Sequence, residues 1–195
     1  MSRFAALLVL VLGSLPVIVL AGASSARAEG FRIDSARFAI GWANPEALEW
    51  TGHPEADGTL VGGEALFTMP PLPPTGSGFL DRLLSPLLHV GGMVNLENDH
   101  TSYVYAGYTW RYDITERLFW ETSLGLSANN GDDCCPAVRA RLGSHVLFRE
   151  AVAIGFRFTP SASVVFQAEH MSHARLFGDL NRGLSHLSVK FALDF

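Results

Sequence analysis

The chain has 195 residues, a formal net charge of −5 at pH 7 and two cysteines. The acidic balance argues against a nucleic acid partner. Beyond the N-terminal region no apolar run is long enough for a transmembrane helix. The chain is nevertheless 48% hydrophobic, so its apolar residues have to be buried, or placed against lipid, in another form.

The first 28 residues predict a cleaved signal peptide. Arg3 gives a positive start, residues 4–23 are almost wholly apolar, and Ala26-Arg27-Ala28 is a small-x-small cleavage site. An uncleaved membrane anchor is the alternative, because the apolar run is long for a signal peptide. Cleavage would remove two arginines and no acid, leaving 12 basic and 19 acidic residues. We expect residues 29–195 to form one domain.

Eight segments of this domain have alternating apolar residues, a pattern typical of strands in a transmembrane β-barrel. We interpret 139–158 as one strand because its alternation is unbroken; a hairpin turning at Arg149-Glu150 would give nine strands. The first segment is irregular, since its apolar phase slips between Ile33 and Phe38. A soluble periplasmic β-sandwich is the competing fold. The segments are 31–43, 60–69, 86–97, 102–113, 116–128, 139–158, 162–172 and 185–195.

An even number of strands places both chain ends on the periplasmic side. Residues 113–115 and 159–161 then form short periplasmic turns, and 70–85 a longer connection with a short interfacial helix over 79–84. Residues 44–59, 98–101, 129–138 and 173–184 become outer loops. A terminal Phe195 closing an alternating strand resembles the C-terminal signal of outer-membrane barrels. Polar residues of the fourth and fifth segments are predicted to line the interior: Thr109, Arg111, Arg117, Glu121 and Ser123.

Cys134 and Cys135 are adjacent in one outer loop. Neighbouring cysteines cannot join distant segments, and their spacing gives no zinc site. We interpret them as a loop feature; a redox function is the less favoured alternative.

The 162–172 segment ends in His170-Met171-Ser172. On a strand, residues two positions apart point to the same face, and Val164 and Phe166 mark this face as the lipid side. An imidazole beside a hydroxyl is the minimum needed to activate a serine. The pattern therefore predicts an esterase on the outer wall. Alternatively, both groups simply meet water in the headgroup region. His173 falls on the opposite face from His170, so no metal site is predicted.

The sequence resembles the lipid A 3-O-deacylases of the PagL type, also called acyloxyacyl hydrolases. The resemblance implies an eight-stranded outer-membrane barrel with a Ser-His-Glu triad on its outer surface. It also implies hydrolysis of the ester-linked acyl chain at the 3-position of lipid A, without a cofactor. The matching stretches are Gly62–Phe67, Pro86–Asn95, Thr101–Gly107, Leu142–Glu150, His170–Ser172 and Asn181–Leu184.

The resemblance assigns His170 as the catalytic base and Ser172 as the nucleophile. Asn181 matches an asparagine of the oxyanion site, and His173 stands where the family has another asparagine. The family Glu begins the last strand and faces outward, which points to Ser185; strict counting from His170 gives Leu184 instead.

Neither Ser185 nor Leu184 is a carboxylate, and Asp179 is the nearest loop acid that would substitute. The expected function is hydrolysis of lipid A in the lipopolysaccharide of the outer membrane. The alternative is a catalytically impaired barrel that binds lipid A or serves as an envelope scaffold. Whether the barrel forms a homodimer is left open.

Overall fold

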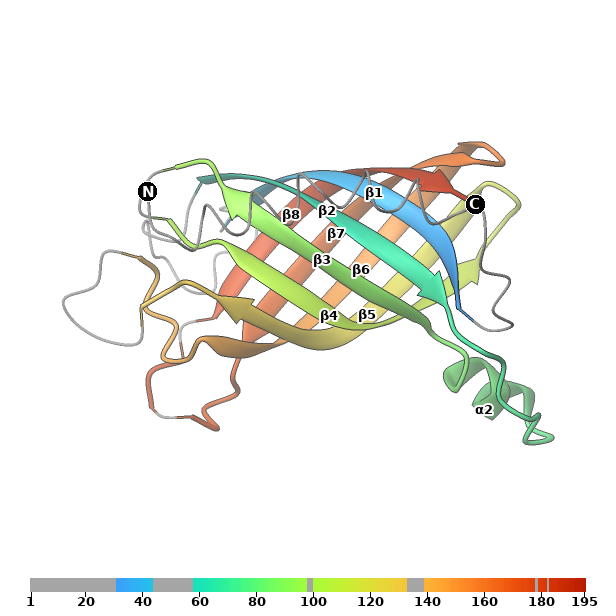
Figure 1. The fold of residues 1–195 in the computed structure, drawn as a ribbon, viewed down its shortest axis with the longest axis horizontal. Coiled ribbons are helices and arrows are strands. Elements are labelled where there is room, and N and C mark those ends of the chain that lie inside the picture. Colours follow the sequence, from blue (N-terminus) through green and yellow to red (C-terminus); the bar gives the residue numbers. More distant parts are fainter. Residues whose placement is uncertain (1–30, 44–57, 98–99, 133–138, 178, 182) are drawn as a thin grey trace.

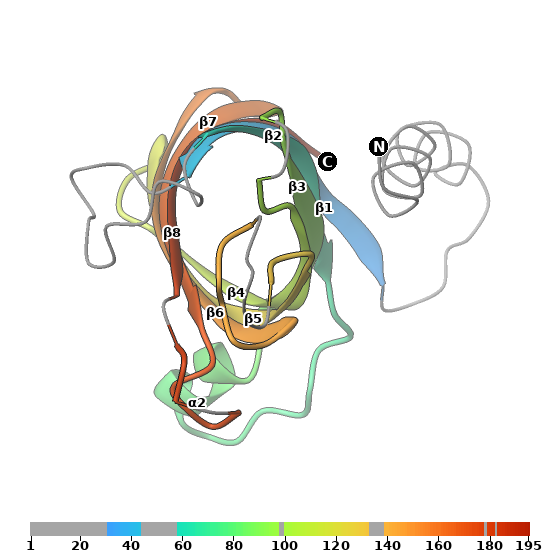
Figure 2. The ribbon, with the colours of Figure 1, turned by 90° about the vertical axis from the view of Figure 1, so that its left-hand side faces the viewer.

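The computed structural model describes residues 31–43, 58–97, 100–132, 139–177, 179–181 and 183–195. In this part of the chain every strand pairs antiparallel with its neighbour in sequence, and β8 pairs with β1 to close a barrel (Figure 1, and end-on in Figure 2). Closure confirms the predicted fold class and excludes a sandwich. The strands are β1 (Arg32–Ala43), β2 (Gly58–Thr68), β3 (Leu87–Asn95), β4 (Tyr103–Asp113), β5 (Leu118–Asn129), β6 (Val146–Thr159), β7 (Ala162–Ser172) and β8 (Leu184–Asp194).

β6 is a single strand, as predicted, but it begins at Val146 and not at residue 139. Leu142 is buried, whereas Val146, expected on the same face, is 45% exposed, so the alternation breaks between them. The break lies at Gly143, whose φ is +74° and whose missing side chain leaves room for the Leu180 carbonyl. Only glycine adopts this backbone conformation readily, so the strand cannot extend through it.

The phase slip in β1 is a β-bulge. Ile33 pairs with Phe67 and Ser35 with Leu66, so Asp34 is the extra residue in the ladder. A bulge moves all following side chains to the opposite parity. This restores Phe38 and Trp42 to the exposed face of β1, and it explains the irregular pattern of the sequence.

The barrel interior contains buried ion pairs, some of which join strands that are not neighbours. Arg37 on β1 donates two hydrogen bonds to Glu121 on β5, at 2.7 and 2.8 Å. Glu121 also accepts from Arg111 at 2.8 Å, and Lys190 on β8 donates to Glu64 on β2 at 2.7 Å. Thr109, Glu121 and Ser123 are buried here as predicted.

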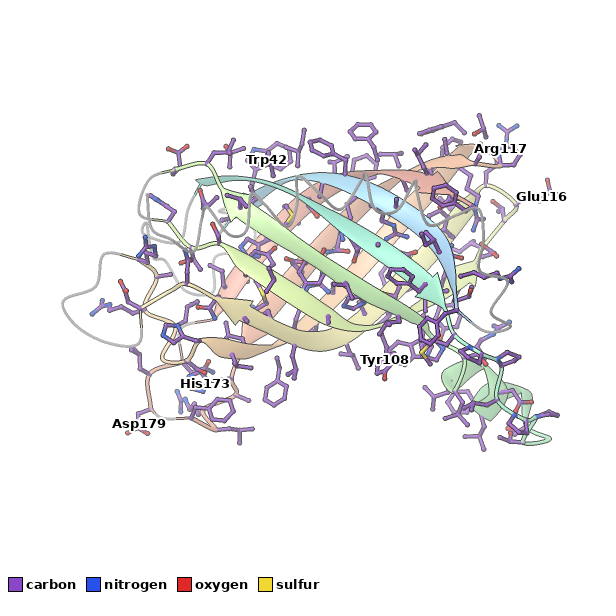
Figure 3. The ribbon with its side chains drawn as sticks, viewed as in Figure 1. Trp42, Tyr108, Glu116, Arg117, His173 and Asp179 are labelled. Carbon is purple, nitrogen blue, oxygen red and sulfur yellow. The ribbon has the colours of Figure 1, made fainter. Side chains whose placement is uncertain are left out.

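Arg117 was wrongly predicted to line the interior. It precedes β5 in an exposed turn, beside Glu116 at the end of the barrel (Figure 3). Its backbone N–H donates to Thr115 Oγ1 at 3.2 Å, which closes the turn before the strand alternation begins.

The predicted interfacial helix is α2 (Gly78–Leu83), which lies at the opposite end of the barrel from the loop joining β7 and β8 (Figure 1). Its Leu83 carbonyl accepts a hydrogen bond from Trp110 Nε1 on β4 at 2.9 Å, so the helix is attached to the barrel wall. Across the described residues, no helix has the length and apolarity to cross a membrane. The predicted signal peptide and the Cys134–Cys135 pair lie outside the described residues.

Candidate active site

The orientation of β7 is fixed by what its inward face binds. Glu169 points into the barrel, where it accepts hydrogen bonds from Arg149, Tyr103 and Gln167. A shift of one residue would turn this buried carboxylate outward and lose all three partners. His170 is therefore held on the outward face, together with Ser172.

The outward face of β7 is the one that the sequence predicted. Ser163, Val165, Gln167, Glu169 and Met171 are buried, and the residues between them are partly or fully exposed. Phe166, on the same face as His170 and Ser172, is 53% exposed on the barrel exterior. An imidazole and a hydroxyl thus share a face whose other residues are apolar.

Ser185 lies beside His170 on the neighbouring strand. The two residues are direct partners in the β7–β8 ladder, and His170 Nδ1 is 2.9 Å from Ser185 Oγ. Of the two candidate positions for the family acid, the structure brings Ser185 to the imidazole. Leu184 pairs with Met171 and is buried on the inward face.

Gly183 leaves space for the other edge of the imidazole. A Cβ atom on this residue would lie 2.8 Å from His170 Cε1 and 3.1 Å from His170 Nε2. Gly183 comes one position beyond the Met171–Leu184 pair, the level at which Ser172 lies on β7. The ring therefore extends from Ser185 toward the level of Ser172, with Nδ1 at the first and Nε2 at the second.

His173 organises the loop that follows Ser172. It is fully buried, its Nδ1 accepts the Phe177 N–H at 3.3 Å, and its Nε2 lies 2.7 Å from the Leu180 carbonyl. Because Nδ1 accepts, Nε2 carries the proton and donates. The side chain is therefore used to shape the loop.

Asn181 is oriented by the same loop. Its Oδ1 accepts the backbone N–H of His173 at 3.1 Å. An N–H donor can only bond the amide oxygen, so the side-chain nitrogen of Asn181 carries two donors. Neither donor bonds any residue in the described part of the chain. The structure thus occupies the His173 N–H and leaves the Asn181 amide available beside Ser172.

Asp179 is not brought to the imidazole. It is exposed in the loop after β7, beyond His173 (Figure 3). Within the described residues it makes no hydrogen bond or ion pair.

An apolar groove of about 400 Å³ lies on the barrel exterior and reaches Ala168, the outward residue before His170 on β7; neither His170 nor Ser172 lines it. Ala168 lies in its wall, between Phe166 and His170 on the outward face, and pairs with Val152 on one side and Leu187 on the other. Two tryptophans, Trp42 of β1 and Trp120 of β5, also line it; Trp42 projects outward from the barrel (Figure 3). The His170 imidazole and the Ser172 hydroxyl thus share their outward face with an apolar surface suited to an alkyl chain.

Sequence reasoning did not single out Gly143 and Gly183, which shape the site because they have no side chain. Gly143 accommodates the Leu180 carbonyl and Gly183 accommodates the imidazole. Both have positive φ. Both also stand within the stretches that carry the family resemblance, Leu142–Glu150 and Asn181–Leu184, which was the signal available in the sequence.

The sequence matches a family model described as lipid A 3-O-deacylase (PagL) over residues 84–194. Among solved structures, the outer-membrane enzyme PagL is similar with a TM-score of 0.57 and 16% identity, over 83% of this chain and 99% of that one. Neisserial surface protein A aligns with a TM-score of 0.48 and 12% identity, over 86% of this chain and 100% of that one. A designed transmembrane β-barrel aligns with a TM-score of 0.48 and 10% identity, over 87% and 98%. No curated protein matches the chain.

The family match covers more than half of the chain and includes every candidate site residue. The PagL structure confirms the fold independently, because its barrel is aligned over almost its full length. The apolar exterior and the buried ion pairs are what a barrel surrounded by lipid requires. The chain therefore belongs to the PagL family of lipid A 3-O-deacylases and is an eight-stranded barrel of the bacterial outer membrane.

Proposed function

We propose that this barrel is a serine esterase that hydrolyses the ester-linked acyl chain at the 3-position of lipid A. The observation that carries the proposal is the outward imidazole of His170, which lies 2.9 Å from Ser185 Oγ and follows Ala168 of an apolar groove on the outward face of β7. The family match supplies the substrate class. Ser172 is the proposed nucleophile, since it shares the face of His170 and directly follows it in the alternation.

In this mechanism His170 Nδ1–H donates to Ser185, which leaves Nε2 unprotonated as the base. Nε2 takes the proton of Ser172 as Oγ attacks the ester carbonyl, and the Asn181 amide donates to the resulting oxyanion. The bond to the sugar oxygen then breaks, and His170 returns the proton to that oxygen. His170 then takes a proton from water as the water attacks the acyl-serine, the bond to Ser172 Oγ breaks, and His170 returns the proton to Oγ, which releases the fatty acid and restores the serine.

His173 and Asp179 have different places in this proposal. The backbone N–H of His173 acts through Asn181, which it holds in position at 3.1 Å, so His173 is a positioning residue. Asp179 has no role in this proposal, because it is exposed and forms no hydrogen bond or ion pair with His170 or any other described residue. No cofactor is needed for this chemistry.

The test is release of 3-hydroxy fatty acid from lipopolysaccharide by the purified barrel in detergent. We expect release by the wild type and none by Ser172→Ala. Ser163→Ala is the matched control, because Ser163 is on the inward face of the same strand. Equal release by wild type and Ser172→Ala would rule out the proposed nucleophile, and no release by the wild type would rule out the activity.

The second candidate function is a catalytically impaired barrel that binds lipid A. The observation that favours it is Ser185, since a hydroxyl occupies the place beside Nδ1 and cannot balance the charge of an imidazolium. Ser185→Glu separates the two candidates. If the wild type is inactive and Ser185→Glu is active, the chain has lost the carboxylate of the catalytic triad. If the wild type is active, another group supplies the negative charge that stabilises the imidazolium.

A further inference from the structure

The outward face of β6 carries a single charged residue. Its other outward residues are apolar and between 41% and 50% exposed: Val146, Phe148, Val152, Ile154, Phe156 and Phe158. Glu150 stands in the middle of this row and is itself exposed. A carboxylate on the lipid-facing wall of a barrel is destabilising unless it lies near the interface or has a partner.

Glu150 is the direct partner of His170 in the β6–β7 ladder. Paired residues on the same face of antiparallel strands have Cβ atoms about 4.5–5.5 Å apart. His170 is in turn the partner of Ser185 on β8. One row of side chains therefore crosses three strands. His170 lies in its centre, with Glu150 on one side and Ser185 on the other.

We propose that Glu150 supplies the negative charge that the residue at position 185 lacks. The inference rests on the proposed esterase function, in which His170 becomes an imidazolium as it takes the proton of Ser172. A serine hydroxyl orients the ring but brings no charge to balance that cation. A carboxylate one strand away stabilises the cation through space, and more strongly at the edge of the bilayer than in bulk water. Glu150 is thus a positioning and charge-balancing residue that replaces the family acid from the opposite strand.

The other groups around the imidazole do not provide this charge. From β8 the outward neighbour is neutral Ser185, and His186 points inward. Behind the wall, Glu169 is paired with Arg149. In the loop after β7, Arg175 would oppose an imidazolium, and Asp179 is exposed and makes no hydrogen bond or ion pair with any described residue. Glu150 is the acid that the strand register places next to His170.

The test is a cycle of four proteins: wild type, Glu150→Gln, Ser185→Glu and the double variant. The readout is kcat/KM for lipopolysaccharide as a function of pH. We expect Glu150→Gln to lower the plateau of kcat/KM at high pH about 10- to 100-fold, which is less than the roughly 10²- to 10⁴-fold that a general base itself contributes, because His170 is still present. Its acid limb should move to lower pH, because removing a negative charge makes the imidazole harder to protonate. In the double variant, Ser185→Glu restores a carboxylate from β8 and should recover both the plateau and the limb.

The matched control is Glu116→Gln, which removes an exposed carboxylate in a turn at the far end of the barrel (Figure 3). If Glu150→Gln behaves like this control, the inference is overturned while the esterase proposal stands. If Glu150→Gln instead lowers the plateau of kcat/KM without moving its acid limb, and the double variant does not recover, the substitution has a structural effect. That outcome also overturns the inference.

A second readout does not depend on turnover. In the Ser172→Ala background, NMR follows the protonation of His170 with pH, with and without Glu150→Gln. A lower midpoint after Glu150→Gln supports the charge pairing even where lipopolysaccharide is not hydrolysed, so that only the esterase proposal fails. The same midpoint in both proteins contradicts the pairing.

Discussion

Glu169 and His170 are adjacent in sequence and lie on opposite sides of the barrel wall. Glu169 is buried among Arg149, Tyr103 and Gln167, whereas His170 faces outward beside Ser185. Because its partners lie inside the barrel, the Glu169 carboxylate fixes which residues of β7 face inward and which face outward. The position of the outer imidazole therefore depends on a contact network on the inner side of the wall.

We therefore expect Glu169→Ala to destabilise the barrel by about 3–5 kcal/mol, because it leaves the buried Arg149 charge without a partner. The measurement is urea-induced unfolding of the barrel in detergent micelles, followed by circular dichroism. Glu116→Ala is the control and should change the free energy of unfolding by less than about 0.5 kcal/mol, since its side chain is exposed. Equal effects of the two substitutions would show that the network does not hold the strand.

Gly183→Ala is expected to push the imidazole away from its place. The new Cβ would lie 2.8 Å from His170 Cε1, and a displacement of this size should lower kcat at least 10-fold. Gly76→Ala is the matched control: Gly76 also has a positive φ, at +83°, but has no atom within 4 Å of the added Cβ. Both variants carry the backbone strain, so only the first should lose hydrolysis of lipopolysaccharide.

Asn181→Asp tests the oxyanion role without disturbing the loop. Aspartate keeps the oxygen that accepts the His173 N–H and loses the two amide donors. We expect kcat to fall about 10²- to 10³-fold, as for removal of one oxyanion donor, with the thermal stability of the barrel unchanged. A variant with wild-type kcat would show that the oxyanion is stabilised by other groups.

Ala168→Phe should fill the apolar groove, because Ala168 is the smallest outward residue in its wall. We expect a higher KM or loss of hydrolysis for long acyl chains and a smaller effect for short ones, measured on synthetic esters of graded length. Ala106→Phe is the control, since Ala106 is exposed on the wall of β4 and does not line the groove. The groove is not the acyl site if both variants act alike.

The alternation of the sequence was sufficient to predict the barrel and the outward face of His170 and Ser172, because strand parity is a local property. It also predicted Ser185 in preference to Leu184 as the residue beside the imidazole, since only one parity of β8 faces outward. The start of β6 was wrong because an unbroken alternation hides the positive φ of Gly143. That conformation depends on the Leu180 carbonyl, which comes from a distant loop.

The pairing of Glu150 with His170 could not be predicted in the same way. Alternation gives the face of each residue, but the residue opposite it depends on register. The register between β6 and β7 depends on the tight turn after Thr159 and on an irregularity between Arg157 and Thr159. The sequence shows these residues without showing how many of them the turn uses.

The apolar groove that reaches Ala168 lies on the outside of the barrel wall, among the exposed side chains of Phe166 and Trp42. A molecule that reaches it arrives by travelling within the leaflet and does not pass through the central axis, which is filled by paired charges. The frequency of encounter then follows the number of lipid molecules per unit area of membrane, not their amount per volume of solution. Mixing in inert detergent at constant total lipopolysaccharide should accordingly slow hydrolysis in proportion to the surface dilution.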